Sequence, residues 1–91
     1  MIEKHHSLRD QMGQIMKHEL HTMLLRTRQH MDLTQTKMAE HYVMSNTSYS
    51  DLERGKTSCG TLTMLLLLND QEDPGAALQN LVNKICEDIE E

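Results

Sequence analysis

Residues 33–55 read LTQTKMAEHYVMSNTSYSDLERG, and this pattern predicts two short helices joined by a tight turn. Thr34 and Ser45 each precede one helix, where a hydroxyl can accept a free backbone N–H and cap the helix start. Gly55 directly follows the second helix, at a position where a left-handed cap favours glycine. Each helix has one apolar face at helical spacing, formed by Met38, Ala39 and Tyr42 in the first and by Tyr49 and Leu52 in the second.

The outward face of the second helix is small and polar, and it consists of Asn46, Thr47, Ser48, Ser50 and Asp51. Such side chains can hydrogen-bond to the edges of DNA bases without blocking close approach. A helix face that only contacts water usually carries more Lys and Glu. The composition therefore favours a binding surface, with a solvated face as the alternative.

This region also carries a set of residues at characteristic offsets from one another: Arg28, Leu33-Thr34-Gln35, Met38-Ala39, Ser45 and Glu53-Arg54-Gly55-Lys56. This set resembles the Cro/repressor (Xre-type) helix-turn-helix family, and the resemblance covers roughly residues 20–69, about half of the chain. Two positions differ from the family pattern. Val43 stands in the turn, where the family usually has glycine, and Tyr49 stands where the family has isoleucine.

The resemblance implies that the second helix lies in the DNA major groove. Asn46, Thr47, Ser48 and Asp51 would then face the bases, with Ser50 at the margin of the contact. Asparagine can form two hydrogen bonds with adenine, and aspartate can accept one from the cytosine amine. Candidate contacts to the DNA backbone are Gln35, Ser45, Arg54 and Lys56, of which Gln35 sometimes reaches a base in the family.

The resemblance also implies an internal frame for this helix. Arg28 and Glu53 would form an ion pair that orients it, and two exposed charges are the alternative. Tyr42 and Tyr49 would lie in the core rather than stack on nucleic acid. The implied fold class is all-α, a five-helix lambda-repressor-like helix-turn-helix domain with an N-terminal helical extension and a C-terminal amphipathic helix.

Three segments are predicted along the chain. Residues 1–19 form a mostly helical extension, in which the helix starts at Ser7. Residues 20–69 form the helix-turn-helix domain, and residues 70–91 form the C-terminal amphipathic helix. Within 61–69, the run 65–68 is apolar on all sides, so more than one face must be covered. Asp73-Pro74 is a strong start signal for the last helix.

The last helix carries an apolar stripe, formed by Leu78, Leu81, Val82, Ile85 and Ile89. This stripe is larger than such a short chain needs for its own packing. It is predicted to form a dimer surface, because helix-turn-helix proteins read two half-sites by two-fold symmetry. The alternative is that it only covers the small domain.

Ninety-one residues suit one small domain, and eight methionines with no phenylalanine or tryptophan predict a modest core. The net charge of −5 argues against a generic nucleic-acid coat. The acid is concentrated elsewhere, because residues 26–56 hold five basic against four acidic residues, a net charge of +1, whereas residues 57–91 hold one against seven, a net charge of −6.

Other classes of site find little support. Cys59 and Cys86 lack ligand-like spacing, so reduced thiols in a cytoplasmic protein are expected. His18 and His21 lack a third metal ligand, so no metal site is predicted. No catalytic set of side chains stands out, so neither an enzyme nor a cofactor is predicted. No signal peptide is recognised, and the apolar run 64–68 is too short to cross a membrane.

The resemblance thus implies a repressor-like transcription regulator from a bacterium or phage, a homodimer that binds a palindromic operator in double-stranded DNA. The alternative is a protein-interaction module, such as an antitoxin whose terminal helices bind a toxin.

Overall fold

The computed structural model describes residues 7–89, which form five α-helices and no β-strand. These are α1 (Leu8–Met31), α2 (Gln35–His41), α3 (Asn46–Glu53), α4 (Thr61–Asn69) and α5 (Pro74–Asp88). The prediction of an all-α fold with five helices is confirmed. Residues 1–6 of the predicted extension and residues 90–91 of the C-terminal segment lie outside the described residues.

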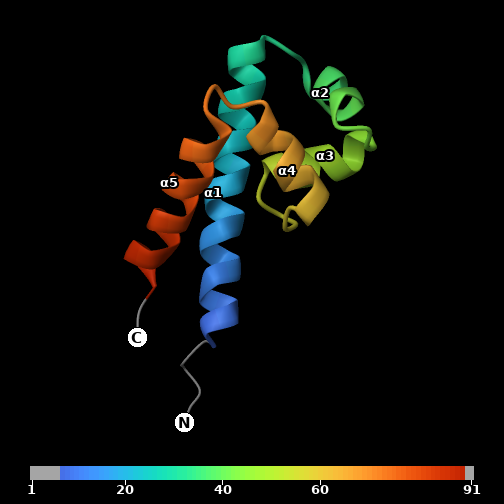
Figure 1. Ribbon diagram of the computed structural model, residues 1–91. Helices are drawn as coiled ribbons and strands as arrows, with labels where there is room; N and C mark the ends of the chain where they lie inside the picture. Colours follow the sequence, from blue (N-terminus) through green and yellow to red (C-terminus); the bar gives the residue numbers. More distant parts are fainter. Residues whose placement is uncertain (1–6, 90–91) are drawn as a thin grey trace.

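Helix α1 is the long axis of the molecule (Figure 1). Helix α5 runs back along one side of it, and α2, α3 and α4 gather on the other side. The principal extents are 46 × 28 × 19 Å. The elongation comes from the N-terminal turns of α1, which continue past the group of shorter helices.

Four of the five helices begin at a side-chain cap that the sequence predicts. In each case the capping oxygen accepts the backbone N–H three residues later at 3.1 Å, and the capping residues are Ser7, Thr34, Ser45 and Asp73. Such caps satisfy a donor that the helix itself leaves unpaired, and each is typically worth about 1 kcal/mol. Pro74 occupies the first turn of α5, where its missing N–H costs nothing.

The predicted boundary at residue 19 does not interrupt α1, which is a single helix of 24 residues. Its C-terminal half is buried through Leu20 and Leu24, whereas Leu8 and Met12 near its start are exposed. The described part of the extension is therefore continuous with the domain, and its first turns project beyond the core.

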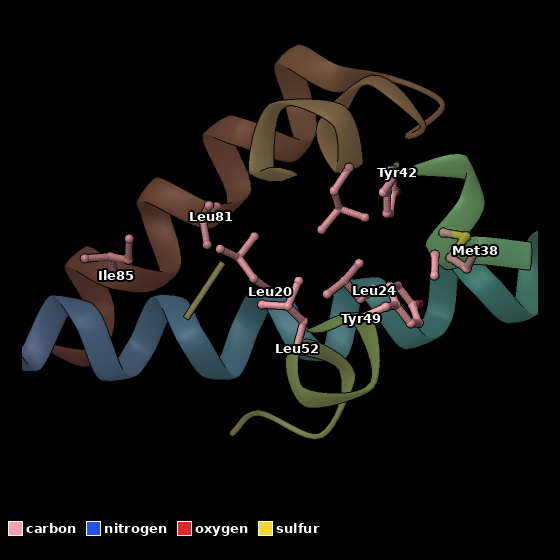
Figure 2. Close-up of a cluster of buried hydrophobic side chains, with 10 residues drawn as sticks. Leu20, Leu24, Met38, Tyr42, Tyr49, Leu52, Leu81 and Ile85 are labelled. Atoms are coloured by element: carbon pink, nitrogen blue, oxygen red, sulfur yellow. The ribbon is translucent and has the colours of Figure 1, made fainter. Parts of the chain in front are cut away.

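The core lies where α1 meets the other four helices (Figure 2). The largest fully buried side chains are Tyr49, Leu20, Leu24, Met38 and Leu67. Burying one such apolar side chain contributes about 1.5–3 kcal/mol. Tyr42 and Tyr49 are both buried, as predicted. The core thus packs α3 against α1, and α2 packs against α3.

Helix α4 differs from its prediction at Leu65. Leu67 and Leu68 are buried, but Leu65 is 53% exposed and Leu62 is 71% exposed. Leu66 is partly buried against the core, so three of the four side chains of the run 65–68 are at least partly covered. Because successive helical residues point about 100° apart, the expectation that more than one face of the run 65–68 is covered holds for 66–68, and Leu65 is the exception.

Candidate nucleic-acid interface

The turn between α2 and α3 passes through a left-handed residue, Val43, whose φ is 57°. Its N–H donates to the carbonyl of Glu40 at 3.0 Å, and the N–H of Met44 donates to the carbonyl of Ala39 at 3.0 Å. This pattern closes the end of α2 in the way that glycine usually permits. A β-branched residue is strained in this region of φ/ψ space. The Val43 side chain is exposed, so it makes few packing contacts that could offset this strain.

The end of α3 is closed by the same pattern at Gly55, whose φ is 76°. Gly55 N–H donates to the Leu52 carbonyl at 3.1 Å, and Lys56 N–H donates to the Asp51 carbonyl at 2.9 Å. A Cβ on Gly55 would come within 3.4 Å of the His21 ring. Both the left-handed φ and the close approach of α1 therefore call for glycine here.

The carboxylate of Glu53 anchors α3 to the rest of the molecule. Arg28 donates to it twice, from Nε to Oε2 at 2.8 Å and from Nη2 to Oε1 at 2.9 Å. Tyr49 Oη donates to Oε2 at 2.6 Å, and Gln35 Nε2 donates to Oε1 at 3.0 Å. Arg28 also donates from Nη1 to the Leu33 carbonyl at 3.1 Å. One carboxylate thus joins α1, α2 and α3, and the predicted Arg28–Glu53 pair is formed rather than exposed.

This network perturbs the titration of its members. Burial by itself would raise the pKa of Glu53, but hydrogen bonds from Arg28, Tyr49 and Gln35 hold that pKa below its ordinary value. The hydrogen bond to Glu53 raises the pKa of Arg28. Burial, reinforced by the hydrogen bond to Glu53, raises the pKa of Tyr49. The ionised Glu53–Arg28 pair is therefore the favoured state at neutral pH.

A shallow groove runs over the outer side of α2 and α3. It is lined by Gln35, Thr36, Asn46, Thr47, Ser50, Asp51, Arg54 and Lys56. Seven of the nine residues predicted to contact DNA therefore come together on one surface. The charged groups lie toward the end of α3, where Lys56 Nζ is 3.8 Å from Asp51 Oδ1.

The other two predicted contact residues do not line this groove. Ser45 caps α3, and Ser48 lies with Asp51 in a neighbouring depression beside the start of α4. Gln35 lines the groove but donates its amide to Glu53, so its side chain is held in place from inside the molecule.

Two residues near this surface were missed by sequence reasoning. Thr36 lines the groove, and its place next to Gln35 in the first turn of α2 was the available signal. His21 Nδ1 lies 3.2 Å from the Glu53 carbonyl oxygen, a contact across 32 positions that no local pattern indicates.

The predicted dimer stripe on α5 is divided by the structure. Leu81 and Ile85 are buried within the chain, whereas Leu78 and Val82 are 43% and 44% exposed. Ile89 is partly buried against the core. Two of the five stripe residues are thus committed to internal packing, and Leu78 and Val82 form the part of the stripe that a partner can reach.

A second hollow, of about 660 Å³, lies between α1, the segment 70–72 and α5, and Met23, Thr27, Gln71 and Leu81 are among its lining residues. Gln71 donates to Thr27 Oγ1 at 3.0 Å. None of the residues predicted to contact DNA lines it. Among residues 7–89, no group of three or more His, Cys, Asp or Glu side chains is placed to hold a metal ion. His18 and His21 pack edge to face instead, with ring centroids 5.3 Å apart.

No protein-family model matches this chain, and neither a curated protein nor a solved structure matches it. The resemblance to the Cro/repressor family therefore rests on the residues themselves and stays a prediction. Within the part of the chain that the structure describes, no helix combines the length and the apolar character needed to cross a membrane.

Proposed function

We propose that α2 and α3 act as a helix-turn-helix unit and that the chain is a sequence-specific DNA-binding regulator. The observation that carries this proposal is the groove over α2 and α3, where seven residues chosen from sequence alone converge. Its lining of amide, hydroxyl, carboxylate and cationic groups suits the mixture of base edges and phosphates in a DNA major groove.

The residues of the groove divide into two chemical roles. Asn46, Thr47, Ser50 and Asp51 carry short donors and acceptors that can bond to base edges. Arg54 and Lys56 carry the positive charge that attracts phosphates, and neither is buried. Only two cations serve this role, so the dependence of affinity on salt is expected to be shallow, about 0.9 log units per phosphate contact for each tenfold change in salt.

The rigid frame behind the groove supports the same function. Reading bases requires the recognition side chains to be held in a defined orientation, because a helix that tilts loses its hydrogen-bond geometry. Glu53 ties α3 to α1 and α2 through three side-chain hydrogen bonds, two from Arg28 and one from Gln35. We further propose a homodimer on a palindromic operator, since two-fold symmetry places two such helices about one DNA turn apart.

The proposal is tested by selecting binding sites from a random duplex-DNA library with the purified full chain. Enrichment of a palindrome with half-sites separated by about one helical turn is expected. Asn46→Ala combined with Thr47→Ala should abolish that enrichment without changing the melting temperature, because both side chains are exposed in the first turn of α3.

The matched control is Asn80→Ala, an exposed asparagine on α5 that lines the second hollow. This variant should enrich the same site as the wild type. If the wild type enriches no sequence, or if the Asn46/Thr47 double variant enriches the same palindrome, the assignment of this surface to DNA is refuted.

A second candidate function, a protein-interaction module such as an antitoxin, is favoured by a different observation. Leu62 and Leu65 on α4 are more than half exposed, and Leu78 and Val82 on α5 are nearly half exposed. Exposed apolar side chains at this density often mark a protein contact. Both functions are compatible in one chain, because these residues lie outside the groove over α2 and α3.

A further inference from the structure

Helix α3 carries two acidic residues, and the structure gives them opposite surroundings. Glu53 is turned inward, with a side chain only 6% exposed, and is bonded to Arg28. Asp51 lines the groove together with Asn46, Thr47 and Ser50. A carboxylate on a surface that approaches DNA is unfavourable toward phosphates. Its presence there calls for a hydrogen-bond donor on the DNA.

We propose that Asp51 selects a cytosine in the binding site and is a specificity-determining residue of this chain. This inference rests on the proposed DNA-binding function and adds to it the identity of one base.

Two contacts with Lys56 locate Asp51, one through its backbone and one through its carboxylate. Its backbone carbonyl accepts the Lys56 N–H at 2.9 Å in the turn that ends α3. Its Oδ1 lies 3.8 Å from Lys56 Nζ, and its side chain is 27% exposed. The ammonium group offsets part of the repulsion between the carboxylate and the phosphates. Asp51 thus lines the groove beside a cation.

The chemistry of the bases decides which one this carboxylate can accept. An ionised carboxylate is only an acceptor, whereas guanine and thymine present acceptor atoms to the major groove at O6, N7 and O4. Adenine offers its N6 amine, but the neighbouring N7 would face the second carboxylate oxygen. Cytosine offers its N4 amine beside a carbon-bound hydrogen, so neither oxygen of Asp51 meets an acceptor. Cytosine is therefore the favoured base.

An isosteric variant makes the inference testable. Asn carries one acceptor and one donor, which match the N6 and N7 of adenine. Asp51→Asn should therefore change one position of each half-site from cytosine to adenine, with the cytosine-to-adenine affinity ratio at that position falling by about tenfold or more. Asp51→Ala should accept all four bases at that position. Glu87→Gln, which makes the same charge change at an exposed site on α5, should leave the selected site unchanged.

A second measurement uses the wild-type chain and depends on no variant. N4-methylcytosine keeps the N–H that pairs with guanine and replaces the hydrogen that points into the major groove. Placing it at each cytosine of the enriched site in turn should weaken wild-type binding about tenfold at one position of each half-site only. Asp51→Ala should not distinguish the methylated site from the unmodified one.

The outcomes separate the two proposals. If the wild type enriches a site but tolerates N4-methylcytosine everywhere, or if Asp51→Asn keeps the wild-type base at every position, the Asp51 inference is overturned while DNA binding stands. If the wild type enriches no site, the proposed function fails and the Asp51 inference fails with it.

Discussion

Arg28 on α1 and Glu53 at the end of α3 are joined by two hydrogen bonds of 2.8 and 2.9 Å, one to each carboxylate oxygen. The Glu53 side chain is 6% exposed and that of Arg28 is 20% exposed. Removing Arg28 leaves the buried Glu53 carboxylate with the neutral donors Tyr49 and Gln35 but without its ion-pair partner. We therefore expect Arg28→Ala to lower the free energy of unfolding by about 3 kcal/mol, measured by urea denaturation.

The control for this variant is Arg26→Ala, two residues earlier on the same helix. Arg26 is exposed and forms no ion pair with any of residues 7–89, so its removal should change stability by less than about 0.5 kcal/mol. Equal, small losses for both variants would show that the Arg28–Glu53 pair does not hold α3 in place.

The lowered pKa of Glu53 predicts a pH dependence of stability with a definite sign. The pKa lies below its ordinary value of 4.5 in the folded chain, so the ionised group stabilises the fold above that value. This contribution disappears as the pH falls through the folded pKa. Glu53→Gln should be less stable than the wild type at about pH 7, and the difference should shrink toward about pH 3. Melting temperatures across this range measure it, and a constant difference would contradict the prediction.

Replacing the strained turn residue Val43 by glycine is expected to stabilise the fold. Its φ of 57° is unfavourable for a β-branched side chain, and that side chain is 89% exposed. Val43→Gly should therefore raise the free energy of unfolding by about 1 kcal/mol, seen as a higher melting temperature. Val43→Ala, which keeps a Cβ, should give a smaller gain. A lower melting temperature for Val43→Gly would show that the turn has another conformation in solution.

Much of the fold could be predicted because its signals are local. Ser7, Thr34, Ser45 and Asp73 cap helices through the N–H three residues ahead, and the sequence contains everything that such a contact requires. The same holds for the left-handed Gly55. The groove could be predicted for a related reason, since its residues lie within 22 positions of one another, from Gln35 to Lys56.

The features that could not be predicted depend on contacts between distant segments. Periodicity marks Leu78, Leu81, Val82 and Ile85 as one apolar stripe, but only the crossing of α5 over α1 decides that Leu81 and Ile85 are buried. In the same way, the Gln35 amide belongs to the Glu53 network because α2 and α3 meet. Gln35, which the sequence predicts to contact DNA, thus also supports the structure from inside.

The division of the α5 stripe predicts how its variants will behave. Leu78 and Val82 are each more than two-fifths exposed, whereas Leu81 is 5% exposed. If α5 forms the homodimer contact, Leu78→Glu combined with Val82→Glu should convert a dimer into a folded monomer in sedimentation experiments. Leu81→Ala should instead lower the free energy of unfolding by about 2–5 kcal/mol, because it opens a cavity in the core.

Asn80→Glu provides the matched control, since it adds a charge to an exposed position of the same helix, on the side that lines the second hollow. It should sediment like the wild type. A wild-type chain that is monomeric, or a Leu78/Val82 double variant that stays dimeric, would exclude the exposed part of the stripe as the contact. In the second case the exposed leucines of α4, Leu62 and Leu65, become the surface to change next, because a dimer must bury apolar area that one chain leaves open.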